Sequence, residues 1–116
     1  MGMSSTTQAF QFATDYAQLF QAAMTAVQGV KKASLTAADM NANYLSFETP
    51  FGLMSYGERV VVGFVPSAQG VVVEVTCTTK GIPNLMQDGR NRKLIAQFVE
   101  GLANLVRVAP VEVARS

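Results

Sequence analysis

Histidine and tryptophan are absent from this chain, and Cys77 is its only cysteine. Without histidine, the chain lacks the commonest metal ligand and the commonest general base of enzymes. A single cysteine cannot form a disulfide within the chain. Zinc sites and catalysis by Ser-His or Cys-His pairs are therefore excluded, and we expect no metal, no cofactor and no enzymatic activity.

Charge is also scarce. Charged residues make up 15% of the 116 residues and hydrophobic residues 49%, whereas an average domain has roughly 25% charged residues. The formal net charge of +1 gives no global field to attract nucleic acid or anionic lipid. A charge-poor surface favours contact with protein, so we expect a homodimer or another protein partner, and we do not expect nucleic-acid binding.

Signals for export or membrane insertion are missing as well. Residues 1–10 have neither the charged start nor the apolar centre of a signal peptide, and no apolar run approaches the roughly 18 residues of a membrane span. We therefore expect a cytoplasmic protein with no membrane partner. The length suits one domain, which we place at residues 8–106, with residues 1–7 and 107–116 as flexible termini.

Two segments have the periodicity of amphipathic helices. After Asp15, apolar residues recur every three or four positions as far as Gly29, and Asp15 with Gln18 fits a helix-capping pair. A second apolar stripe runs over residues 94–106, and Asp88 suits the N-cap of that helix. The sequence therefore predicts one helix near each end of the domain.

Between and before these helices the period changes to two. Alternation of apolar and polar residues predicts strands at residues 9–13, 32–37, 44–49, 58–65 and 71–79. Short connections join the last four strands, so they pair antiparallel. We predict an α+β fold: a single antiparallel sheet of about five strands with two helices on one face, in the order β-α-β-β-β-β-α.

Two short motifs add a family resemblance. "SYGER", residues 55–59, and "DGRNRK", residues 88–93, resemble the two signatures of a widespread group of small bacterial domains of unknown function. The resemblance covers about residues 8–106 and implies an architecture similar to the TATA-binding-protein-like fold, β-α-β4-α. It implies no activity.

The second motif places three cations at the start of the last helix, where the helix dipole favours acids. In one interpretation Asp88 caps the helix and pairs with Arg90 or Arg92, and the cations are screened by salt. In the other, the cations surround the free amides of the helix start and bind a phosphate, nucleotide or acidic peptide. The residues of this hypothetical anion site are Lys80, Gly89, Arg90, Asn91, Arg92 and Lys93.

Asn91 differs from its charged neighbours. At about 100° per residue it falls at the centre of the apolar stripe of the predicted helix. We therefore expect its amide to be buried and to bond a neighbouring loop backbone. Cys77 alternates with valines and is expected to be a small buried hydrophobe.

The predicted sheet has apolar residues on both faces of residues 58–65. If both helices cover one face, Val61, Val65 and Val72 remain on the other. Exposed valine is common in strands, but these three could also form a homodimer contact. Glu48, Glu58 and Glu74 could meet on the same open face. The leading hypothesis is a non-catalytic interaction or ligand-binding module that self-associates, and the alternative is the anion site.

Overall fold

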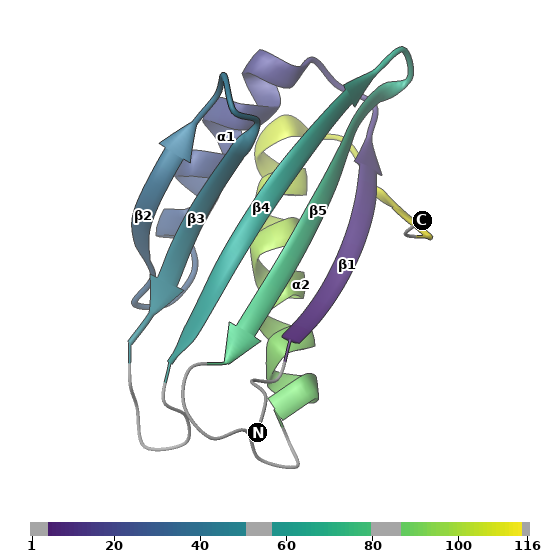
Figure 1. The fold of residues 1–116 in the computed structure, drawn as a ribbon. Helices are drawn as coiled ribbons and strands as arrows, with labels where there is room; N and C mark the ends of the chain where they lie inside the picture. Colours follow the sequence, from purple (N-terminus) through teal and green to yellow (C-terminus); the bar gives the residue numbers. More distant parts are fainter. Residues whose placement is uncertain (1–4, 51–56, 80–86, 115–116) are drawn as a thin grey trace.

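A computed structural model describes residues 5–50, 57–79 and 87–114. It contains β1 (Ser5–Phe12), α1 (Tyr16–Gln28), β2 (Ser34–Asp39), β3 (Tyr44–Thr49), β4 (Glu58–Ser67), β5 (Gly70–Thr79), α2 (Gln87–Val106) and β6 (Val111–Val113). The strands form one antiparallel sheet in the order β2-β3-β4-β5-β1-β6. Both helices lie behind this sheet (Figure 1). The predicted α+β class, with a single sheet and two helices on one face, is confirmed.

Local sequence explains most element boundaries. The Asp15 side chain accepts a hydrogen bond of 3.0 Å from the Gln18 amide, which confirms the predicted cap of α1. Gly29 is the C-cap of that helix, also as predicted. The second helix begins two residues earlier than a cap at Asp88 would give, at Gln87, so Asp88 lies inside its first turn and is not its N-cap.

The ends of the domain differ more from prediction. Residues 5–7 belong to β1, and residues 111–113 form β6, which pairs with β1. The prediction assigned these two segments to flexible termini over residues 1–7 and 107–116, whereas the structure places them in strands. The sheet has six strands, because the chain returns after α2 and covers the free edge of β1.

The core lies between the sheet and the helices. Alternate residues of β4 and β5 point toward the helices, and the rings of Phe47 on β3 and Phe98 on α2 lie 5.4 Å apart. Tyr16, Phe20 and Phe64 form a second aromatic group, with the rings of Phe20 and Phe64 5.3 Å apart. Cys77 is fully buried in this core, as predicted.

Candidate functional site

The start of α2 is tied to the sheet by a chain of hydrogen bonds. The Asn91 amide nitrogen donates to the Thr6 hydroxyl at 3.2 Å, and that hydroxyl donates to the Asp88 carboxylate at 2.6 Å. The Asn91 amide oxygen accepts from the Thr79 hydroxyl and the Cys77 thiol, each at 3.4 Å. The predicted burial of Asn91 is confirmed, and these partners are side chains of β1 and β5. A bond to a loop backbone stays a prediction.

Arg92 and Asp88 form an ion pair on the helix surface. The Arg92 Nε and an Asp88 carboxylate oxygen lie 2.9 Å apart, one helical turn from each other. The hydrogen bond from the Thr6 hydroxyl is the larger cause, and the hydrogen bond from Arg92 the smaller one, that hold the pKa of Asp88 below its ordinary value. One of the three cations is therefore compensated within the helix, as the first interpretation requires.

The described members of the hypothetical anion site differ in their exposure. Arg90 is half-buried and Lys93 is exposed, and within the described residues neither forms an ion pair. Gly89 is exposed in the first turn, while Asn91 points into the core. Lys80 lies outside the described residues. Anion binding at this helix start stays a prediction.

Buried polar side chains gather at the same end of the sheet. In the described part of the chain they are Thr6, Thr49, Glu58, Thr79 and Asn91. Cross-strand pairing places Glu58 beside Thr49 on one side and Thr79 on the other. The Thr49 hydroxyl donates to the Glu58 carboxylate, and the Glu58 amide donates to the Thr49 hydroxyl at 3.0 Å. Of these five residues, Asn91 is the one whose burial was predicted from sequence periodicity.

The three acids proposed to meet on the open face do not do so. Glu58 is buried on the helix-covered face, whereas Glu48 and Glu74 alternate onto the other face. Glu48 pairs there with Arg59 across 3.0 Å.

Burial, followed by the nearby charge of Glu58, raises the pKa of the Cys77 thiol to about 12. Cys77 is therefore a protonated thiol at neutral pH.

The open face of the sheet exposes the predicted valines. Val61 and Val65 are 40% and 59% exposed, and Val72, the cross-strand partner of Val65, is half-buried. Gly63 lies between the two β4 valines, opposite the partly exposed Tyr44. A Cβ at Gly63 would contact nothing within 4 Å, so the space above this glycine is open. We call Tyr44, Val61, Gly63, Val65 and Val72 the sheet-face patch.

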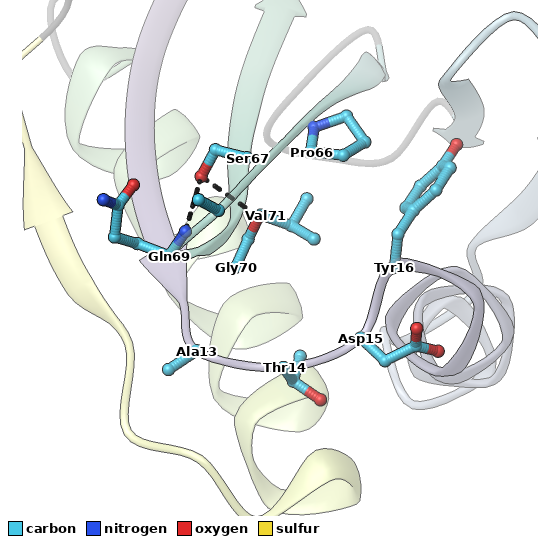
Figure 2. Close-up of a pocket in the computed structure, with 10 residues that line it drawn as sticks. Ala13, Thr14, Asp15, Tyr16, Pro66, Ser67, Gln69, Gly70 and Val71 are labelled. Atoms are coloured by element: carbon cyan, nitrogen blue, oxygen red, sulfur yellow. Dashed lines mark hydrogen bonds between the residues drawn. The ribbon is translucent and has the colours of Figure 1, made fainter.

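The structure has a pocket of ≈ 530 Å³ that the sequence did not predict. Figure 2 shows the residues that line it. It lies between residues 13–16, which lead into α1, and residues 66–71 at the tip of the β4–β5 hairpin. Several of its polar groups serve the fold: Ser67 donates to the Gly70 carbonyl, Tyr16 donates to the Met40 carbonyl, and Asp15 caps α1. Burial, followed by the charge of Asp39, raises the pKa of Tyr16. These contacts lie within the hairpin tip, at the start of α1, and between α1 and the turn after β2.

Among the described residues, no helix is long and apolar enough to span a bilayer. No protein-family model matches the chain. No curated protein sequence matches it either.

Solved structures, in contrast, share its fold. The chain is similar to Ara h 8.0201, with a TM-score of 0.67 and 12% identity over 91% of this chain and 99% of that one. It is also similar to the di-domain ARO/CYC StfQ from the steffimycin biosynthetic pathway, with a TM-score of 0.54 and 12% identity. That match covers 89% of this chain and 49% of StfQ, so this chain spans about half of the di-domain protein. At such identity the likeness concerns the fold alone.

These neighbours have a Bet v 1-like, START-type α+β fold. The resemblance to the TATA-binding-protein-like fold is therefore not confirmed. Both architectures place helices on one face of an antiparallel sheet, and two five- or six-residue motifs do not distinguish them. The chain is thus an α+β domain whose architecture resembles that of the Bet v 1-like structures.

Proposed function

We propose that this protein is a non-catalytic binding module that self-associates through the sheet-face patch. The observation that carries the proposal is the exposure of Val61 and Val65 on the helix-free face, next to Val72 on the adjacent strand. Burying apolar surface of this kind is favourable at about 25 cal/mol per Å². The open space above Gly63 leaves room there for a side chain of a second copy.

Ligand-binding domains and polyketide cyclase domains both have this fold, so the fold does not choose between binding and catalysis. The non-catalytic assignment rests on side-chain chemistry. The chain has no histidine, its one cysteine is a buried thiol, and its candidate acids lie on opposite faces of the sheet. General acid–base work requires such groups to converge on one substrate.

Light scattering and sedimentation velocity up to millimolar concentration test self-association. We expect the wild-type chain to associate, and Val65→Lys to weaken association by at least about tenfold. Leu105→Lys is the control, because Leu105 is 48% exposed on α2, away from the patch. A wild-type monomer at every concentration, or equal effects of the two variants, would refute the proposal.

Anion binding at the start of α2 is the second candidate. It is favoured by Arg90 and Lys93, the cations left without an ion pair in the described residues. Asp88 in the same turn opposes an anion there, which places this candidate second. An amide-resolved NMR titration with phosphate, a mononucleotide and a short oligonucleotide tests it. Saturable, salt-sensitive shifts at residues 89–94 support the site, and their absence at millimolar ligand excludes it.

A further inference from the structure

The edge strand β2 presents a second surface suited to a second copy of the chain. The sheet order places β2 at one edge and β6 at the other. The edge at β6 is short, at three residues, whereas β2 has six. Within the described residues no strand pairs with the outer side of β2, so that side offers backbone donors and acceptors to a further strand.

The side chains around this edge carry little charge. Asp39 is the only charged residue of β2 and α1 together, and α1 lies behind β2 and β3 (Figure 1). Five of the six residues of β2 are exposed, including Leu35 at 45%. Depletion of charge at the centre is a compositional mark of protein–protein interfaces. An unpaired edge in such surroundings suits protein contact.

The few charges at this edge are arranged for self-complementarity. Lys31 and Lys32 precede the first residue of β2, and Asp39 is its last residue. Antiparallel pairing of two β2 strands about a two-fold axis brings the lysines of each copy toward Asp39 of the other. Parallel pairing would instead place lysines beside lysines. The Asp39 carboxylate is held in position by bonds from the Asn41 and Ala42 amides, at 3.0 and 3.1 Å.

We infer that β2 pairs antiparallel with β2 of a second copy, which joins two sheets into one continuous sheet. A register shift between Leu35 and Ala37 interrupts the regular ladder of β2, and such bulges weaken edge pairing. The backbone pairing between the two β2 strands is therefore short. Leu35 and the uncharged face of α1 supply the remaining contact area. This inference goes beyond the sheet-face contact and shares with it only the premise that the chain self-associates.

Disulfide trapping tests the pairing directly. Single cysteines are introduced as Leu35→Cys or Thr36→Cys, and Val111→Cys is the matched control, 64% exposed on the opposite edge. The native Cys77 is fully buried, so it does not compete for oxidation. We expect at least one β2 variant to form a covalent dimer about ten times faster than the control, because pairing raises the effective concentration of the thiols. Equal rates would overturn the inference, since random collision treats exposed cysteines alike.

The charges are tested in the trapping variant that reacts fastest. Asp39→Asn removes the carboxylate charge while keeping an oxygen for the Asn41 and Ala42 amides. We expect slower trapping than in the parent at low salt, and less sensitivity to added salt. Trapping that is unchanged by Asp39→Asn would refute the antiparallel arrangement.

Adding Val65→Lys separates the two contacts. Trapping through β2 that survives this substitution supports an independent edge contact, and trapping that is lost would show that the sheet face brings the copies together. Failure of trapping in a protein that still self-associates through Val65 refutes the edge inference alone. A protein that is monomeric at every concentration refutes both.

Discussion

Asn91, fully buried on α2, donates a hydrogen bond to Thr6 on β1, 85 residues earlier in the chain. Thr6 in turn donates to Asp88, and Asp88 pairs with Arg92. The first turn of α2 is thereby fixed to the sheet through polar contacts. Of the three cations that the dipole should disfavour there, Arg92 has a partner within the helix, while Arg90 and Lys93 are the residues left for a ligand.

Replacing Asn91 tests this connection. Asn91→Ala removes the acceptor of Cys77 and Thr79 and the donor to Thr6, and it leaves buried polar groups unsatisfied. We expect a loss of about 2–4 kcal/mol in the free energy of unfolding, measured with urea. Asn104→Ala, at an exposed position of the same helix, should cost less than about 0.5 kcal/mol. Similar losses in the two variants would contradict a structural role for the Asn91 amide.

Asp88 should make stability depend on pH. Its folded pKa lies below the ordinary value of 3.8, so its charge stabilises the fold above that pH. This contribution disappears as the pH falls through the folded pKa. We therefore expect the difference in unfolding free energy between wild type and Asp88→Asn to be largest near neutral pH and to shrink below about pH 4. A difference that stays constant between neutral and acidic pH would argue against the Thr6 and Arg92 contacts.

Gly70 should tolerate no side chain. Its φ is +122°, and an added Cβ would lie 2.1 Å from the Phe12 carbonyl oxygen. We expect Gly70→Ala to lower the free energy of unfolding by at least about 2 kcal/mol. Gly63→Ala is the matched control, because a Cβ there has open space and the change should remain within about 1 kcal/mol. Urea denaturation of both variants measures these losses. Equal losses in the two variants would mean that the hairpin tip can move off β1.

Cys77 should be unreactive in the folded protein. Its side chain is fully buried, and burial raises the thiol pKa to about 12, so almost no thiolate exists at pH 8. A disulfide reagent in excess should label it only after unfolding. Thr36→Cys provides the comparison, because its introduced thiol lies at an exposed position and should react at once. Rapid labelling of Cys77 in the wild-type chain would show that the core opens locally.

Several parts of the molecule depend on local sequence patterns alone. The Asp15 cap, the end of α1 at Gly29, the alternating valines of β4 and β5 and the burial of Asn91 all follow from spacing along the chain. Helix and strand periods differ enough to be read without tertiary contacts. The α+β class and the exposure of Val61 and Val65 follow from the same patterns.

How these parts meet depends on contacts between residues far apart in the chain. The three residues of β6 are too short a run to predict a strand, and they form one because β1 offers them an open edge. Thr6 and Asn91 are far apart in the chain, and they meet because the strand order places β1 beside β5, where α2 packs. The unpaired edge at β2 likewise exists only once the strand order is known. Sequence spacing governs which face a residue occupies, whereas long-range pairing governs its neighbours.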